Sequence, residues 1–377
     1  MATKRDAEAD ATSTSAPREG EMRALEVSHA PPGQVAVAGA SAADRKQKRL
    51  RQYEVWPGNE RFFCGGLLVT GPYWWSILGT TALILIPSGV FVGLVAYPLY
   101  DEYGLGIAFL CVSAAFPALV TGFLFCTGCI NPGIIPRNPA PSNAASAAAL
   151  PRTREVEVNG HTVVVRYNET CHFYQPPRAH HCSVIDDCIE RFDHYCPWVG
   201  TTVGRRNYRF FLLFVFSCSL LCIYVFAFCA YLIKRKSEGA GTKWEEAIRK
   251  EAAAIILMIF VFIGFWFVGG LSMFHVYLLS RNQTTYENIR YSYDRNYVNP
   301  YNRGCLWNWA EVFCTAMPPS NVNFRGFVDD AGSNHGVGGG REGSEGGDIA
   351  LEVPSSFSGN GAHGAASHDA GQPKEDV

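Results

Sequence analysis

The chain is organised around the stretch Asp193-His194-Tyr195-Cys196-Pro197-Trp198-Val199. This stretch places a carboxylate, an imidazole and a thiol within four residues. A thiol is a good nucleophile only as the thiolate, and a neighbouring histidine can take its proton while a carboxylate orients that histidine. Shortly after it comes Phe210–Ile233, a run without any charged side chain that is long enough to cross a membrane. A nucleophilic thiol in this place suggests chemistry on something that lies in or on a lipid bilayer.

Four long uncharged runs indicate the fold class. Each exceeds the ~20 residues that a helix needs to cross the hydrocarbon core, and a buried soluble helix of that length would show a polar face. None of the four contains Asp, Glu, Lys or Arg. We therefore predict an all-α polytopic membrane protein with four transmembrane helices, at residues 74–97, 105–128, 210–233 and 252–280. Pro87 and Pro117 fall inside the first two spans, where kinks are tolerated.

The distribution of Lys and Arg predicts the orientation. The short loop 98–104 carries neither, whereas nine arginines lie between Arg137 and Arg209. The loop 234–251 is a counter-signal with six basic residues, although four glutamates accompany them. The balance places both termini and the loop between the second and third spans in the cytosol.

The two ends of the chain are predicted to be disordered. Residues 1–50 are polar without apolar periodicity, and the tail 326–377 is rich in Gly and Ser. Between them and the first span, 51–73 forms a juxtamembrane segment. The basic cluster Arg45–Arg51 is read as a solvated flank or as a contact with anionic lipids. No signal peptide is visible, so the thirteen cysteines are expected to be reduced in the cytosol rather than paired as disulfides.

The loop 129–209 is predicted to hold a small cytosolic domain with short β-hairpins, its core at 168–209. Val156 to Tyr167 alternates around Asn159-Gly160, which is a strong hairpin signal. We expect a turn at 193–196, because neighbouring residues on a flat strand face opposite ways. The core also contains residues of the types that bind metals, namely Cys171, His180, His181, Cys182 and Cys188.

This cysteine-rich segment resembles the DHHC-type protein S-acyltransferases, or palmitoyltransferases. The matching motifs are Pro176-Pro177-Arg178, His181-Cys182, Cys188, Asp193 to Val199 and Val203-Gly204-Arg205-Arg206-Asn207-Tyr208-Arg209-Phe210-Phe211. After the last span, the segment 281–325 carries two further motifs of the family: Thr284-Thr285-Tyr286-Glu287, and Asn299-Pro300-Tyr301 with Gly304, Asn308 and Phe313. The resemblance covers residues 51–317 and leaves both ends outside it.

The resemblance implies a two-step transfer of a long acyl chain from acyl-CoA to cysteine thiols of membrane-associated proteins. By position, Cys196 would be the nucleophile, His194 the general base and Asp193 the partner that orients it. Three aromatic residues would line the mouth of an acyl-chain cavity between the helices, or else be ordinary packing residues: Trp198, Phe211 and Phe214. Three cations would face the CoA phosphates, or alternatively lipid head groups: Arg178, Arg205 and Arg206.

The resemblance also implies two zinc ions, each bound by three cysteines and one histidine, and this chain departs from both ligand sets. The first set keeps Cys171, His181 and Cys188, with Asn168 in place of a cysteine and His172 or His180 as candidate fourth ligands. The second set keeps only Cys182, with Ile185, Tyr195 and Thr202 at the other positions. We expect one bound zinc ion and an empty second site, replaced by an apolar contact of Ile185 and a hydrogen bond from Tyr195.

Two other functions compete with acyl transfer. A catalytically silent membrane adapter would explain the missing zinc ligands. A zinc-dependent hydrolase or transporter is weaker, because the first three spans contain no charged residue or histidine and the fourth has only His275 near its end. The net charge of −2 does not indicate a nucleic-acid partner. The family suggests the Golgi or another endomembrane, with the ER or plasma membrane as alternatives.

Overall fold

The computed structural model describes residues 49–141, 150–239, 245, 249–294 and 297–328. The two predicted disordered tails, except for residues 49–50 and 326–328, and most of the linker before the predicted hairpin lie outside these residues. Within the described ranges, four helices are long and apolar enough to cross a membrane. The predicted fold class is confirmed: this is a multi-pass membrane protein with a cysteine-rich region of short strands between its second and third spans.

The spans follow the uncharged runs closely. The first consists of α1 (Trp75–Phe91), a π-helical turn η2 (Val92–Ala96) and α2 (Tyr97–Asp101). The other three are α3 (Ile107–Cys129), α5 (Tyr208–Gly239) and α7 (Ala252–Ser280). Pro87 lies inside α1, and the π-helical turn follows it in the same span. A π-helical turn of this kind is a recognised cause of bending in long helices.

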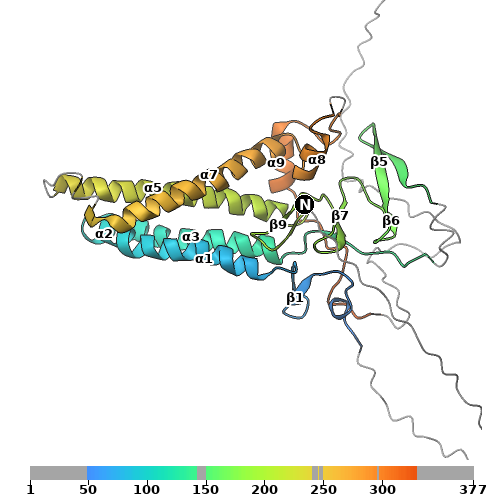
Figure 1. The fold of residues 1–377 in the computed structure, drawn as a ribbon, viewed down its shortest axis with the longest axis horizontal. Coiled ribbons are helices and arrows are strands. Elements are labelled where there is room, and N and C mark those ends of the chain that lie inside the picture. Colours follow the sequence, from blue (N-terminus) through green and yellow to red (C-terminus); the bar gives the residue numbers. More distant parts are fainter. Residues whose placement is uncertain (1–48, 142–149, 240–244, 246–248, 295–296, 329–377) are drawn as a thin grey trace, which may run out of the picture. The chain divides into compact units, whose positions relative to one another are not determined.

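Apolar packing holds the four spans together. Figure 1 shows them running alongside one another, with the strands gathered at one end of the bundle. Their buried side chains form one apolar cluster, which includes Ile77 of α1, Leu124 of α3, Leu212 of α5 and Leu257 of α7. Other large apolar side chains, such as Trp266, stay exposed on the outside of the helices. An apolar exterior is what a surface in contact with lipid requires.

Short antiparallel strand pairs build the part of the molecule outside the spans. β1 (Arg61–Phe63) and β2 (Leu68–Thr70) form a hairpin after the single turn η1 (Gln52–Glu54). β4 (Thr153–Val158) and β5 (His161–Asn168) form the predicted hairpin, and β6 (Phe173–Tyr174) extends it. Asn159 and Gly160 both have positive φ, at 49° and 78°, as a two-residue hairpin turn requires. A second sheet has the order β3 (Ile134–Ile135), β8 (Asp187–Ile189), β7 (His180–Cys182).

The expectation of a turn at 193–196 is wrong. β9 (His194–Cys196) is a strand that pairs with β10 (Thr201–Val203), and the turn follows it at 197–200. His194 and Cys196 are two residues apart on this strand, so they lie on the same face. Asp193 lies before the strand, so it is not bound by the rule that neighbouring side chains of a strand point to opposite faces. Its carboxylate can therefore reach His194.

One buried side chain ties the small domain to the helix ends. Nδ2 of Asn207 donates to the carbonyl oxygens of Thr127 and Thr202, each at 2.9 Å. Its Oδ1 accepts the N–H of Gly204 at 2.8 Å. Thr127 is near the end of α3, Thr202 is in β10, and Asn207 directly precedes α5. The last turn of α3, the strand β10 and the start of α5 are therefore fixed together.

The segment after α7 packs at the end of the bundle where the strands lie (Figure 1). It contains two short helices, α8 (Thr285–Tyr291) and α9 (Cys305–Phe313). Asn308 of α9 is fully buried, and its Nδ2 donates to the carbonyl oxygen of Ser280 at the end of α7 at 2.8 Å. This hydrogen bond holds the second C-terminal motif against the end of the last span.

Candidate active site

Asp193, His194 and Cys196 meet where the strand pair β9–β10 joins the helix bundle. The carboxylate of Asp193 lies 2.6 Å from Nδ1 of His194. His194 and Cys196 lie two residues apart on β9, so their side chains share one face of the strand. Cys196 is buried in the same apolar cluster as the side chains of the four spans. The structure therefore brings together the three residues that the sequence singled out, with the thiol facing the membrane-embedded part of the molecule.

The surroundings of Asp193 and His194 favour the charged form of both side chains. Burial disfavours the charge of Asp193, but the hydrogen bond and charge of His194 outweigh it and lower the pKa of Asp193 to about 2. Burial also disfavours the charge of His194, but its hydrogen bonds with Asp193 and Cys196 raise the pKa of His194 to about 10. At neutral pH this imidazole therefore holds a proton firmly, as a base that must take the proton of a thiol should.

Thr285 holds the carboxylate from the other side. Its N–H donates to Oδ1 of Asp193 at 2.9 Å, and its hydroxyl donates to Oδ2 at 2.8 Å. Thr285 begins α8, where Thr284 caps the helix and exchanges hydrogen bonds with Glu287 in a capping box. The Thr-Thr-x-Glu motif thus forms a short helix whose first residue orients the carboxylate of Asp193.

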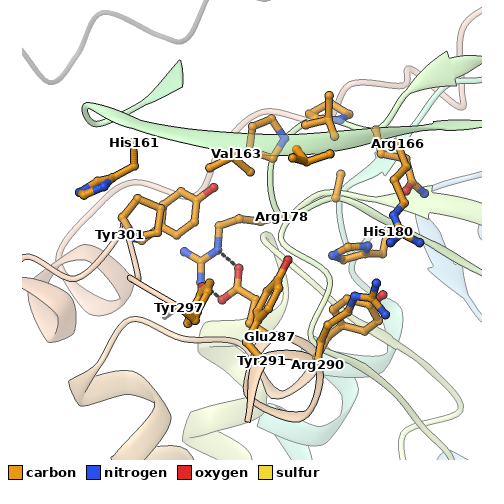
Figure 2. Close-up of a pocket in the computed structure, with 18 of the residues that line it drawn as sticks. His161, Val163, Arg166, Arg178, His180, Glu287, Arg290, Tyr291, Tyr297 and Tyr301 are labelled. Carbon is orange, nitrogen blue, oxygen red and sulfur yellow. Dashed lines mark hydrogen bonds and ion pairs between the residues drawn. The ribbon is translucent and has the colours of Figure 1, made fainter. Parts of the chain in front are cut away.

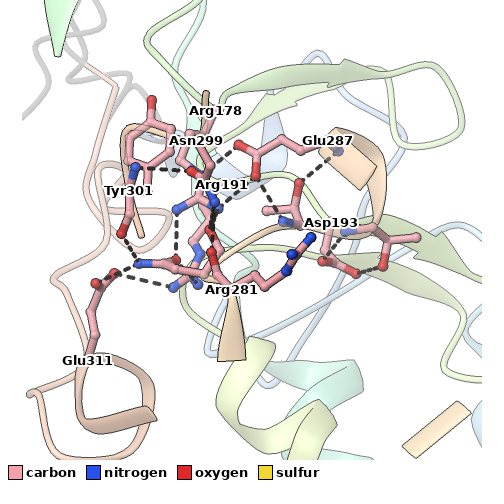
Figure 3. Close-up of polar contacts among 11 residues, drawn as sticks. Arg178, Arg191, Asp193, Arg281, Glu287, Asn299, Tyr301 and Glu311 are labelled. Carbon is pink, nitrogen blue, oxygen red and sulfur yellow. Dashed lines mark hydrogen bonds and ion pairs between the residues drawn. The ribbon is translucent and has the colours of Figure 1, made fainter. Parts of the chain in front are cut away.

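A buried polar network joins the small domain to the C-terminal segment (Figure 3). Arg178 donates to both carboxylate oxygens of Glu287 at 2.8 Å, and its Nη1 donates to Oδ1 of Asn282 at 3.0 Å. Arg191 donates to the same oxygen at 3.0 Å. Asn282 in turn donates to Glu311 of α9 at 2.9 Å. Sequence reasoning missed Arg191, Asn282 and Glu311, because each gains its role only from a contact far along the chain.

The three aromatic residues predicted to line the acyl-chain cavity have different surroundings. Phe211 is buried, with its ring centroid 5.2 Å from that of His194. Phe214 is buried in the cluster formed by the spans. Trp198 is about half exposed and its ring lies 5.8 Å from that of Phe267 in α7. All three thus lie at the border between the catalytic strand and the helices, and their contact with an acyl chain stays a prediction.

The three cations predicted to face CoA are all engaged within the protein. The guanidinium of Arg178 is in the buried pair with Glu287. Arg206 donates to the carbonyl oxygens of Asn131 and Pro318, at 3.0 and 2.9 Å. Arg205 pairs with a glutamate at 3.1 Å, but its side chain remains 46% exposed. Of the three, Arg205 has the most accessible guanidinium, and CoA contact by any of them stays a prediction.

His275 is a further residue at the site. It is buried near the end of α7, with its ring centroid 6.1 Å from that of His194. The hydroxyl of Tyr208 lies 3.3 Å from its Nδ1. A ring nitrogen of His275 also lies within 4.8 Å of the polar atoms of both Asp193 and His194. The sequence signal was available, since a histidine inside a membrane span is costly and marks a functional position.

Cys171, in the turn between β5 and β6, lies beside His181 of β7 and Cys188 of β8. Nδ1 of His181 is 3.6 Å from Sγ of Cys171 and 3.9 Å from Sγ of Cys188. Ligands of a tetrahedral zinc ion, bound at ~2.3 Å for sulfur and ~2.1 Å for nitrogen, are about 3.5–3.8 Å apart. The three residues therefore fit one zinc ion. Among the described residues, neither His172 nor His180 joins this group.

The residues at the second predicted metal position are part of an apolar cluster. Ile185 is fully buried in a cluster with Cys182 and Phe324. The hydroxyl of Thr202 donates to Sγ of Cys182 at 3.2 Å. The prediction of a hydrogen bond from Tyr195 is wrong. Its hydroxyl is buried, and it has no hydrogen-bond partner among the residues that the structure describes. One sulfur and no histidine do not fit a zinc ion, so nothing in the mechanism is assigned to a metal here.

A cavity of about 830 Å³ lies between β5 and α8 (Figure 2). Its lining includes three arginines and four tyrosines: Arg166, Arg178, Arg290, Tyr286, Tyr291, Tyr297 and Tyr301. The ion pair of Arg178 with Glu287 lies at its wall. The residues that line this cavity do not include Asp193, His194 or Cys196. It is thus a basic, aromatic cavity outside the spans, separate from the thiol.

Comparison with known proteins gives a consistent result. Residues 164–292 match the family described as DHHC palmitoyltransferase. "Probable protein S-acyltransferase 7" from Arabidopsis thaliana is 46% identical over 294 residues, which cover 74% of this chain and 66% of the relative. "Probable protein S-acyltransferase 6" from the same plant is 44% identical over 292 residues, covering 74% and 71%. "Protein S-acyltransferase 8" is 44% identical over 300 residues, covering 74% and 73%. At these identities over most of its length, the chain belongs to the DHHC family of protein S-acyltransferases.

Proposed function

We propose that this membrane protein is an active protein S-acyltransferase, which carries a long acyl chain on Cys196 between acyl-CoA and the cysteine thiols of proteins. One observation carries the proposal. Thr285 orients Asp193, Asp193 contacts His194 at 2.6 Å, and His194 shares one face of β9 with the buried thiol of Cys196. A silent adapter has no need of a carboxylate and an imidazole aligned with a thiol.

In the first step, Cys196 becomes acylated. His194 takes the thiol proton, and Sγ attacks the carbonyl carbon of the acyl-CoA thioester. A new carbon–sulfur bond forms as the bond to the CoA sulfur breaks, and His194 gives its proton to the CoA sulfur, which leaves as a thiol and restores the neutral imidazole. Asp193 stays ionised throughout and stabilises the imidazolium, as its pKa of about 2 requires.

In the second step, the acyl group moves to a protein. A cysteine thiol of the substrate gives its proton to His194 and attacks the thioester carbonyl carbon on Cys196. The bond to Sγ of Cys196 breaks, and the proton returns from His194 to that sulfur. The same base thus serves both half-reactions, with no net change in the enzyme.

The position of the thiol supports a lipid-like acyl donor. Cys196 and Phe211 share an apolar cluster with the membrane helices, so an acyl chain attached to Sγ can lie among apolar side chains rather than in water. Arg205 and Arg206 stand just before α5, on the side from which a charged CoA would approach. The substrates inferred on this basis are proteins that present a cysteine at the membrane surface.

We also infer one bound zinc ion and a cytosolic active site. Cys171, His181 and Cys188 would hold the zinc ion, which would cross-link the loop before β6 with β7 and β8. Both termini are inferred to lie in the cytosol, because the arginine-rich loop and the flanks lie on one side of the four spans. An endomembrane such as the Golgi is the location inferred from the family.

Labelling with acyl-CoA tests the proposed activity. Purified protein in detergent is incubated with labelled palmitoyl-CoA, and half of each sample is treated with hydroxylamine, which cleaves thioesters. We expect hydroxylamine-sensitive label on the wild type and none on Cys196→Ser. Cys64→Ser is the matched control, because Cys64 is exposed and lies in the β1–β2 hairpin. Label that persists on Cys196→Ser, or a well-folded wild type without label, would refute the proposal.

A further inference from the structure

The zinc-ligand group has three members instead of four. Asn168 stands where the resemblance places a fourth ligand, but its side chain is used by the backbone. Oδ1 of Asn168 accepts the N–H of Cys171 at 2.8 Å and the N–H of Thr170 at 3.1 Å. Such an Asx turn shapes the loop that carries Cys171 and leaves the amide oxygen occupied.

The neighbouring polar side chains support the ligands instead of completing the set. Oδ1 of Asp186 lies 3.4 Å from Nε2 of His181, the ring nitrogen that faces away from the sulfurs. Nε2 of Gln175 donates to Sγ of Cys188 at 3.6 Å. Contacts of this kind fix the orientation of ligands from behind. His180, a candidate fourth ligand, instead stacks on Tyr286 with the ring centroids 3.9 Å apart.

We propose that this domain binds its zinc ion through three protein ligands and leaves the fourth coordination position to an exchangeable neutral ligand, which is water in the resting protein. Zinc sites with three protein ligands keep such an open position, whereas structural sites are closed by four. This inference rests on the zinc binding proposed above and is independent of acyl transfer.

The charges around the site select a neutral ligand. The two thiolates of Cys171 and Cys188 balance the two charges of the zinc ion, and both cysteines are fully buried. Beyond them stand two carboxylates, Asp186 and Asp187, which share the single guanidinium of Arg137 at 3.0 and 3.1 Å. An anionic fourth ligand would add a further negative charge to a buried site that has no spare cation among these groups. Water or imidazole is therefore favoured over azide.

Small molecules have a route to the edge of the site. His181 and Gln175 both belong to the lining of the cavity of about 830 Å³ between β5 and α8. The side chain of His181 is 19% exposed, although the two sulfur ligands are fully buried. A small neutral donor can thus approach from the cavity past the imidazole.

Cobalt(II) substitution tests the inference, because its visible spectrum reports the number and type of ligands. The full-length protein in detergent is first analysed for metal content, and the zinc is then exchanged for cobalt. We expect one metal ion per chain and cobalt bands that shift on addition of imidazole, with azide producing a shift only at concentrations at least tenfold higher. Acyl-enzyme formation is measured on the same preparation.

Two substitutions of Asn168 provide the comparison. Asn168→Cys supplies a third thiolate, so the sulfur-to-cobalt charge-transfer band should grow about 1.5-fold and the response to imidazole should vanish. Loss of metal to a chelator should slow at least tenfold. Asn168→Ala removes the Asx turn but adds no ligand, so its cobalt spectrum should still respond to imidazole.

Three results would overturn the inference. If the bands of the wild-type cobalt spectrum do not shift on addition of imidazole, the protein itself supplies a fourth ligand. Azide that binds more tightly than imidazole contradicts the charge argument. Folded protein without metal removes both the zinc proposal and this inference, while acyl-enzyme formation in that preparation would leave the proposed function standing.

Discussion

The substitution Asp193→Asn separates the electrostatic role of this carboxylate from the shape of its side chain. It removes the negative charge that helps to raise the pKa of His194 from 6.5 to about 10. Without that charge the pKa of His194 falls back toward 6.5, and at pH 7 the imidazole competes poorly for the thiol proton. We therefore expect a slower first step, measured as the initial rate of acyl-enzyme formation.

The size of the effect follows from the contact. A hydrogen bond to a charged group contributes about 1.5–3 kcal/mol, and the buried 2.6 Å contact between Asp193 and His194 belongs at the upper end. At about 1.4 kcal/mol per factor of ten, the rate at pH 7 should fall about 100-fold. The whole pKa shift of His194 would correspond to about 5 kcal/mol, which is an upper limit because Cys196 contributes to that shift.

The pH dependence gives the sharper test. In the wild type, His194 stays protonated until the pH approaches 10, so the rate should change little between pH 7 and pH 9. In Asp193→Asn, hydroxide can remove the thiol proton in place of the weakened imidazole as the pH rises, so the deficit should shrink with increasing pH. Asp101→Asn, which changes an exposed carboxylate at the other end of the first span, is the matched control. An equal deficit at every pH would refute the electrostatic reasoning and leave only a structural role.

Three further substitutions probe the supporting contacts. Arg178→Met leaves Glu287 buried without its partner and should cost about 3–5 kcal/mol, seen as a lower unfolding temperature, while Arg205→Gln at a half-exposed pair should cost about 1 kcal/mol or less. Thr285→Ala removes one of two hydrogen bonds to the catalytic carboxylate, about 1 kcal/mol, so acyl-enzyme formation should slow about fivefold and Thr285→Ser should restore it. Tyr195→Phe removes a buried hydroxyl that has no described partner, so the unfolding temperature should stay the same or rise; a clear fall would show that the hydroxyl is satisfied.

The parts of this molecule that could be predicted from the sequence are those fixed by local chemistry. Long uncharged runs indicate spans because a charge in hydrocarbon is costly, and Asn159-Gly160 indicates a hairpin turn because both residues tolerate positive φ. His194 and Cys196 are close in space because they are close in sequence, although the strand that aligns them was mistaken for a turn.

The parts that could not be predicted depend on contacts between distant segments. Arg191 carries no local signal, and its role follows from an asparagine 91 residues further along the chain. The hydroxyl of Tyr195 was expected to find a partner, but the replaced metal position filled with apolar side chains and offered none. Packing decides which neighbours a buried side chain contacts. These contacts cannot be predicted from the local pattern of a single sequence.

Asn207 has a consequence for the choice of substrates. Because its amide joins the last turn of α3, β10 and the start of α5, the catalytic strand cannot rise or sink independently of the helix ends. The depth of those helix ends is set by the thickness of the surrounding membrane. The height of the Cys196 sulfur relative to the lipid surface is therefore fixed by the helix ends, and we expect a substrate cysteine to be acylated only when it can reach that height.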